Sequence, residues 1–119
     1  VTQAMLPMLR AAPAPSVVNL SSSMGSLAEN ADPEAPYYSQ RFVGYNASKA
    51  ALNMLTIQLH EELKDEGIKI NSVSPGFVKT DLTGYGEMTA EEGARLPAEY
   101  ALHAEVSGRF VEPEGTTPW

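Results

Sequence analysis

Cysteine is absent from this chain of 119 residues, so the chain can form no disulfide and can offer no thiolate to a metal ion. Long apolar runs are also missing, because no stretch approaches the roughly 18 residues that a membrane-spanning helix needs. Positive charge is scarce, since 8 Lys and Arg residues stand against 15 Asp and Glu residues and give a net charge of −7. A phosphate backbone or an anionic lipid surface would repel such a chain, so we expect neither nucleic acid nor a membrane as a partner.

The amino-terminal residues show no signal-peptide pattern. The chain starts at Val1, and "VTQAMLPML" is typical of the interior of an amphipathic segment. We therefore expect a cytoplasmic protein of which these residues are one piece.

The first half of the sequence predicts a helix end, a strand, a loop and a long helix. Residues 1–12 are the expected last helical turns, with Pro7 as a kink or interruption. The β-branched run at 16–22, "SVVNLSS", predicts a buried strand of a parallel sheet. Residues 24–43 are rich in Gly, Pro, Asn and Asp and predict a loop. Residues 45–65 predict a helix that is apolar almost all round in its first half, and is therefore buried or in an interface.

The second half of the sequence predicts a strand, a helix and a last strand. Gly67 stands where a helix carboxyl end favours glycine, and "IKINSVS" then predicts a strand that closes at Pro75-Gly76. Thr89 and Glu92 have the spacing of a capping box and predict the start of another helix. "VSGRFVEP" predicts a last short strand. The resulting order, β-α-β-α-β, indicates an α/β protein with a parallel sheet covered by helices.

Three patterns in this order carry chemistry. Tyr45 and Lys49 are four positions apart on a helix, which brings their Cβ atoms to about 5–6 Å on one face. An ammonium beside a phenol favours the phenolate and suits proton transfer, although the spacing alone also fits an ordinary surface pair. The serines at 21–23 end a strand at the edge where open α/β sheets bind ligands, or simply terminate it. Pro75-Gly76 ends the next strand, where a flat ring could lie against the backbone.

Together these patterns resemble the short-chain dehydrogenase/reductase family, over nearly the whole chain but only in the carboxyl-terminal half of a family member. "LSSSMG" is similar to the strand that bears the catalytic serine, which falls on Ser22. "YNASK" is similar to the family's Tyr-x-x-x-Lys, and "NSVSPGFVKT" to its Pro-Gly motif with a threonine that falls on Thr80. The resemblance implies that residues 1–119 are part of a single domain, the carboxyl-terminal half of a Rossmann-type doubly wound parallel sheet.

The resemblance also implies roles for single residues. Tyr45 would donate the proton in carbonyl reduction and accept it in alcohol oxidation, and Ser22 would orient and polarise the carbonyl. Lys49 would favour the tyrosinate and hydrogen-bond the nicotinamide ribose. The implied cofactor-binding residues are Tyr45, Lys49, Pro75, Gly76, Val78 and Thr80. The implied substrate-binding residues are Ser22, Met24, Tyr38 and Tyr45, and no metal site is implied.

The chain departs from the family pattern in the separation of Ser22 and Tyr45, which is longer than usual. The excess, "LAENADPEAPYYSQRFVG" at 27–44, resembles the carbonyl-reductase-like branch and favours NADP over NAD as the cofactor. Such an insertion can cover the helix face used for oligomerisation, or it can wall the substrate pocket with Tyr37, Tyr38 and Phe42. A solvated loop with buried aromatics fits equally well.

The Gly-rich phosphate-binding turn of the family, and the asparagine that completes its catalytic tetrad, would lie upstream of Val1. The predicted function is a NAD(P)(H)-dependent oxidoreductase that interconverts a small-molecule carbonyl and a secondary alcohol, with the isolated chain inactive. The alternative is a truncated or catalytically silent member that binds a nucleotide or a partner. The chain is expected as a monomer or as a homo-oligomer that pairs through its first and second helices, and the strand at 16–22 would be an exposed sheet edge.

The remaining candidates are weaker. "HEELK" lacks the second histidine of a zinc motif, so His60 and His103 are expected at the surface or at helix ends. Tyr100, Pro118 and Trp119 could reach the pocket, but a free carboxyl-terminal tail is the expected arrangement.

Overall fold

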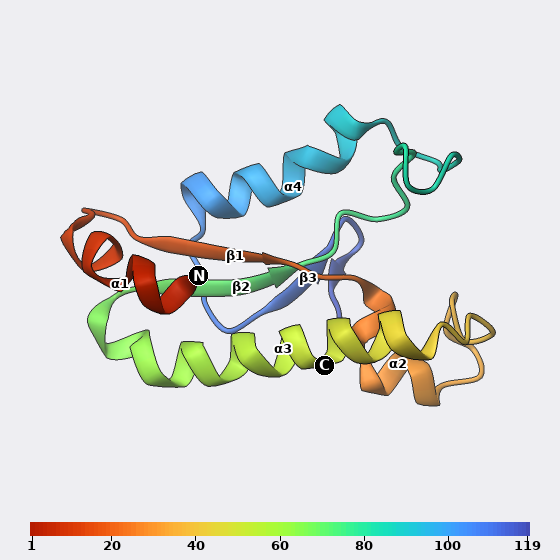
Figure 1. Cartoon of the computed structure of the whole chain (residues 1–119), viewed down its shortest axis with the longest axis horizontal. Helices are drawn as coiled ribbons and strands as arrows, with labels where there is room; N and C mark the ends of the chain where they lie inside the picture. Colours follow the sequence, from red (N-terminus) through yellow and green to blue (C-terminus); the bar gives the residue numbers. More distant parts are fainter.

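Three parallel strands form the centre of the computed structural model, which describes all 119 residues (Figure 1). β1 (Ser16–Leu20) pairs with β2 (Lys69–Val73), which pairs in turn with β3 (Phe110–Glu112). A two-residue strand, β4 (Gly115–Thr116), runs antiparallel to β3. The order β1-β2-β3-β4 leaves β1 as an edge strand, as expected from the sequence. None of its residues is fully buried, since the first four are half-buried and Leu20 is exposed.

Helices cover both faces of the sheet (Figure 1). α3 (Val43–Leu63) runs along one face and α4 (Ala90–His103) along the other. α1 (Thr2–Ala11) lies at the amino ends of the strands and contacts the carboxyl-terminal part of α3 through the core. The expected interruption at Pro7 is not found, since α1 continues through that residue. No helix combines the length and the apolar composition needed to cross a membrane.

Local sequence signals set the helix ends. A 3-10 turn (Lys64–Glu66) follows α3, and Gly67 then adopts the left-handed conformation at φ 74°, which glycine tolerates best. Thr89 and Glu92 form the expected capping box at the start of α4. Both predictions are confirmed.

The apolar core is small and lies between α1, α3 and the sheet. Its buried centre consists of Leu63, Ile68 and Ile70. The half-buried side chains around it are Leu6, Leu9, Val17 and Leu59. At the rim of this core, Arg10 of α1 forms two hydrogen bonds to Glu66.

α3 is less buried than its composition predicts. Only Asn53, Thr56 and Leu63 are buried, while Met54 and Leu55 are 54% and 47% exposed. Of the two expected arrangements, burial within this chain is therefore wrong, because a single flank of α3 contacts the sheet; an interface on the other flank stays a prediction. The outward flank keeps apolar side chains in solvent.

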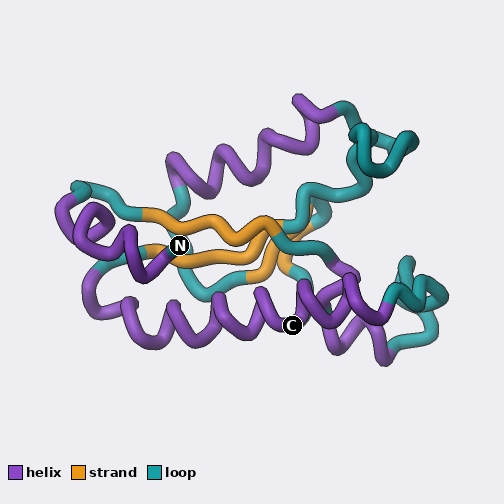
Figure 2. The backbone as a smooth tube through the Cα atoms, in the orientation of Figure 1, coloured by secondary structure: helices purple, strands orange, loops and turns teal.

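Two expected loop segments are more ordered than predicted. Residues 24–43 contain a 3-10 turn (Ser23–Gly25) and a short helix, α2 (Leu27–Ala31), which Figure 2 shows between stretches of loop. The carboxyl terminus is not a free tail. Trp119 stacks on Phe110 with a centroid distance of 5.6 Å, and its carbonyl accepts a hydrogen bond from the Ala28 amide at 3.1 Å.

Candidate active site

The segment after β1 turns back onto α3. Ser22 Oγ accepts a hydrogen bond from the Met24 amide at 3.2 Å and thereby caps the 3-10 turn that follows. That turn lies against Lys49, because a Cβ atom on Gly25 would stand 2.7 Å from the Cβ of the lysine. A close approach of this kind needs a residue without a side chain. The turn therefore brings the segment of Ser22 beside α3, the helix that carries Lys49.

Tyr45 and Lys49 occupy the first turns of α3. The lysine Nζ lies 5.6 Å from the centroid of the tyrosine ring and donates a hydrogen bond to the Leu20 carbonyl at 2.9 Å. Tyr45 is 45% exposed. The ammonium thus joins the carboxyl end of β1 to the helix and leaves one side of the phenol open to solvent.

The predicted cofactor residues after β2 start at the same sheet edge. Leu20 pairs with Val73 in the parallel register, so the segments that carry Ser22 and Pro75 leave neighbouring strands together. Gly76 has φ 85°, and a Cβ atom there would lie 3.0 Å from Met88 Sδ. The left-handed conformation and the close sulfur both favour glycine at this position.

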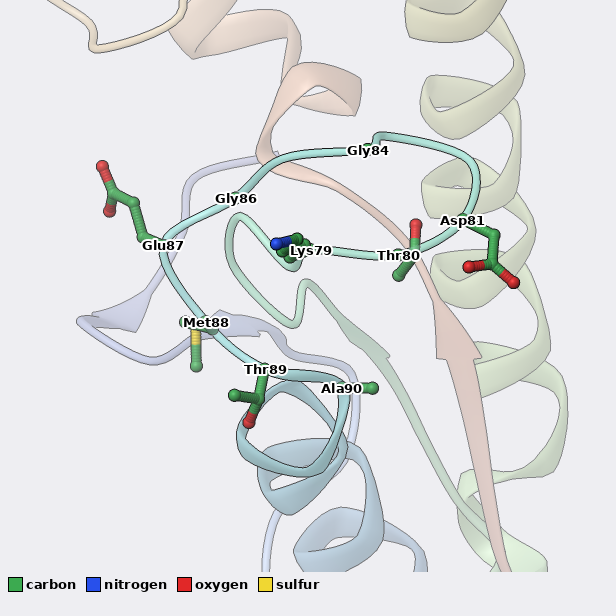
Figure 3. A pocket seen from close by; sticks show the side chains of 9 residues that line it. All are labelled: Lys79, Thr80, Asp81, Gly84, Gly86, Glu87, Met88, Thr89 and Ala90. Atoms are coloured by element: carbon green, nitrogen blue, oxygen red, sulfur yellow. The ribbon is translucent and has the colours of Figure 1, made fainter.

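The loop beyond Gly76 surrounds an open hollow of about 640 Å³. Val78 forms an isolated parallel bridge with Met88, and the loop between them folds over the start of α4 (Figure 3). Of the predicted cofactor residues, Thr80 alone lines this hollow. The lining consists of Lys79, Thr80, Asp81, Gly84, Gly86, Glu87, Met88, Thr89 and Ala90 (Figure 3).

The insertion contributes a second, much smaller hollow beside the serine segment. Its lining consists of Ser23, Met24, Glu29, Asn30 and Tyr37. Of the two substrate residues predicted here, Met24 belongs to it. Tyr38 does not line it; its ring lies under the Arg41 guanidinium at 4.3 Å. Phe42 is 59% exposed.

This small hollow is acidic. Burial, and secondarily the charge of Glu112, raise the pKa of the Glu29 carboxyl. Burial and nearby carboxylates, with Glu87 the foremost, raise the pKa of the Tyr37 phenol. A partly desolvated acid beside like charges favours its neutral form, so this region resists further negative charge.

The sequence reasoning missed the polar side chains beneath the pair of Tyr45 and Lys49. Asn53 is 3% exposed and accepts a hydrogen bond at 2.6 Å from the hydroxyl of Ser21. The signal was present, because position 53 continues the four-residue spacing that joins positions 45 and 49. His60 lies in the last turn of α3, one of the two places expected for it, and its Nδ1 lies 2.9 Å from Ser107 Oγ in a half-buried contact.

Comparisons with known proteins identify the family. The family model described as short chain dehydrogenase matches residues 1–91. The chain belongs to the short-chain dehydrogenase family. Among its relatives, C-signal of Myxococcus xanthus is 39% identical over 123 residues, which cover 100% of this chain and 70% of that protein. The (-)-isopiperitenone reductase of Mentha piperita is 30% identical and is matched over 85% of this chain and 42% of its own length.

Solved structures agree with this assignment. The NADPH-bound carbonyl reductase from chicken fatty liver superposes with a TM-score of 0.79 at 31% identity. The carbonyl reductase Sniffer of D. melanogaster gives a TM-score of 0.77 at 28% identity. Each match covers 99% of this chain and 51% of the solved chain. The chain therefore spans about half the length of these two solved chains, and the predicted Rossmann-type fold and carbonyl-reductase-like resemblance are confirmed.

Proposed function

We propose that the chain is the proton-transferring half of a NAD(P)(H)-dependent oxidoreductase that interconverts a carbonyl and a secondary alcohol. The observation that carries this proposal is the arrangement of Lys49, which is bound to the Leu20 carbonyl and lies beside the ring of Tyr45. Ser22 follows β1 by two residues, so its segment leaves the sheet at the end to which Lys49 is bound.

The residues at this edge fit the nicotinamide half of the cofactor. The Lys49 ammonium has three donors, of which the Leu20 carbonyl takes one, and the others suit ribose hydroxyls. Thr80 adds a hydroxyl, and the bare backbone at Gly76 suits the close approach of a flat ring. The cofactor class is NAD(P), as in the chicken carbonyl reductase with its bound NADPH. NADP is favoured because of the insertion at 27–44. When bound, this cofactor supplies the hydride.

The residues of this chain transfer the proton and orient the substrate oxygen. The Tyr45 hydroxyl gives its proton to the carbonyl oxygen in reduction and takes it back in oxidation. The Lys49 ammonium lies beside the ring and places a positive charge where negative charge develops as the phenol gives up its proton. The Ser22 oxygen accepts from the Met24 amide, and this leaves the serine hydrogen free to donate to the substrate oxygen.

A second candidate is binding of a nucleotide or partner without turnover. Its support is the absence of any G-x-x-x-G-x-G or G-x-G-x-x-G pattern from these 119 residues, so nothing here resembles a cradle for the pyrophosphate. We expect the isolated chain to be inactive for the same reason. A homo-oligomer would pair through the outward faces of α1 and α3, where Met8 and Met54 are exposed.

Titration with half of the cofactor tests the proposal on the chain itself. We expect reduced nicotinamide mononucleotide to shift the amide NMR signals of Tyr45, Lys49, Gly76 and Thr80. Adenosine diphosphate, the other half, should leave them in place. Lys49→Met keeps an unbranched side chain as far as the ε carbon, removes the ammonium, and should weaken these shifts. Shifts confined to other residues, or none at all, would contradict the proposed site.

A further inference from the structure

The flank of α3 that contacts the sheet is polar. Residues at 45, 49, 53, 56 and 60 form one stripe along the helix, because steps of three and four residues return to the same face. Beyond the tyrosine, each member of the stripe bonds to the sheet, to the residue directly after β1, or to the loop before β3. The pairs are Lys49 with Leu20, Asn53 with Ser21, Thr56 with Asn19 and Ser72, and His60 with Ser107. We call this set of contacts the polar seam.

The centre of the polar seam is deeply buried. Asn53 and Ser21 are each 3% exposed, and Thr56 and Ser72 are 0% exposed. The hydrogen bonds there measure 2.6 Å between Ser21 and Asn53 and 2.8 Å between Thr56 and Ser72. A surface helix usually turns its apolar stripe inward and its polar residues outward. In its central turns α3 instead buries the polar Asn53 and Thr56 and leaves the apolar Met54 and Leu55 half exposed.

Polar contacts fix the position of a helix along its axis more sharply than apolar ones. Apolar burial is non-directional, whereas a hydrogen bond weakens steeply with distance and angle. A shift of α3 by one turn, about 5.4 Å, would separate the partners of every seam contact at once. The same shift would carry Tyr45 and Lys49 past the segment that holds Ser22.

Asn53 shows that the polar seam does not simply maximise stability. Its Oδ1 accepts from Ser21, but its Nδ2 is buried without a hydrogen-bond partner. A buried donor without an acceptor loses its hydration and gains nothing in return. An apolar side chain of the same size would avoid that cost. A buried asparagine is known elsewhere to define helix register at the expense of stability.

We propose that Asn53 and Thr56 are positioning residues that set the axial register of α3 on β1. Asn53 bonds to the immediate neighbour of Ser22 and lies one turn beyond Lys49, so it ties the two parts of the proposed site together. Thr56 fixes the next turn to both β1 and β2 through Asn19 and Ser72. The consequence for catalysis rests on the proposed function, while the register itself is a property of the chain alone.

A spin label measures this register directly. The chain has no cysteine, so Gln58→Cys on the exposed side of α3 carries a nitroxide at a single site. The label broadens the amide NMR signals of β1 according to their distance from the helix. Ser21→Ala combined with Asn53→Leu removes both partners of one bond and leaves no group of that pair unsatisfied. We expect this variant to keep its helical content and thermal midpoint, while the broadening shifts or spreads along β1.

Thr56 supplies an independent comparison. Thr56→Val keeps the shape and removes the hydroxyl, so it should alter the broadening, whereas Thr56→Ser keeps the hydroxyl and should restore the original pattern. An unchanged pattern in both Ser21→Ala/Asn53→Leu and Thr56→Val overturns the inference. Failure of the Ser21→Ala/Asn53→Leu variant to fold overturns it too, because the bond would then serve stability. A further outcome is a register that depends on the polar seam while reduced nicotinamide mononucleotide shifts no amide signal of the parent chain. In that case the inference stands and the proposed function fails.

Discussion

Gly25 lies so close to Lys49 that a Cβ atom on the glycine would stand 2.7 Å from both the Cβ and the carbonyl carbon of the lysine. The two residues belong to segments far apart in the sequence, the turn after β1 and the second turn of α3. Their contact has no room for a side chain, and the atoms in the way include helix backbone. The approach of the serine segment to Tyr45 and Lys49 therefore depends on this one glycine.

We expect Gly25→Ala to destabilise the fold by about 1–3 kcal/mol, the usual cost of overpacking a filled contact. The helix backbone at Lys49 cannot yield as the end of a flexible side chain would. Urea unfolding measures the change. Gly44→Ala is the matched control, because a Cβ atom at Gly44 would meet nothing within 4 Å. Equal midpoints for the two variants would contradict the tight contact.

Acid should weaken the attachment of α1 to α3 through Glu66. Hydrogen bonding by Arg10 holds the pKa of the Glu66 carboxyl below its usual range. A carboxyl with a lower pKa in the folded state stabilises the fold above its unfolded value, about 4.3, and this contribution disappears as the pH falls through the folded value. The gap in thermal midpoint between the wild type and Glu66→Gln should be widest at neutral pH and should close in acid.

Salt offers a check on the same pair. Both side chains are partly exposed, so added salt should narrow the gap at neutral pH. Glu99→Gln, at an exposed position of α4, should leave the midpoint nearly unchanged at every pH. A gap for Glu66→Gln that is constant from neutral to acid pH would rule out an electrostatic origin.

Trp119 should report on the carboxyl terminus, because it is the single tryptophan of the chain. It stacks on the buried ring of Phe110, so we expect its emission to shift to longer wavelength on unfolding. Trp119→Leu should cost at least the pair interaction, about 0.5–1.5 kcal/mol. Leu82→Ala, at a side chain that is 93% exposed, should change stability by less than about 0.5 kcal/mol. An emission maximum that is the same in folded and unfolded protein would contradict a docked terminus.

Features with short-range causes could be predicted from the sequence. The cap at Thr89 and Glu92 and the glycine end at Gly67 involve residues within a few positions of each other, and both are confirmed. The parallel pairing of the three main strands followed from the alternation of strands and helices. The proximity of Tyr45 to Lys49 followed from helix geometry.

Features with distant causes could not be predicted. The flank of α3 that meets the sheet is chosen by Asn19 and Ser21, more than thirty residues upstream of their partners on the helix. Nothing in residues 45–65 identifies those polar partners. The apolar composition of the helix was therefore the only guide, and it indicated burial or an interface. The docking of the carboxyl terminus was missed for the same reason. Trp119 stacks on Phe110 of β3, and the sequence does not specify what surrounds that strand. The contact of Tyr38 with Arg41 was missed because the sequence predicted only a loop for the insertion.

The last prediction concerns turnover. We expect the 119-residue chain alone to oxidise no NAD(P)H with aldehydes or ketones, because it offers no Gly-rich turn for the pyrophosphate. Activity should appear when an upstream half supplies that turn, either from the coding sequence before Val1 or in a chimera with the chicken carbonyl reductase. In that protein, Tyr45→Phe removes the proton and should lower kcat by about 10²–10⁴-fold.

The Michaelis constant for the cofactor should change little in Tyr45→Phe, because Lys49 and Thr80 remain to bind the nicotinamide side. Tyr85→Phe is the matched control, since Tyr85 is 70% exposed and has no part in the proposed site. It should leave kcat unchanged. Turnover by the isolated chain would contradict the need for an upstream half. Full activity of Tyr45→Phe would show that the tyrosine does not transfer the proton. This edge of the sheet would then have a role in binding alone.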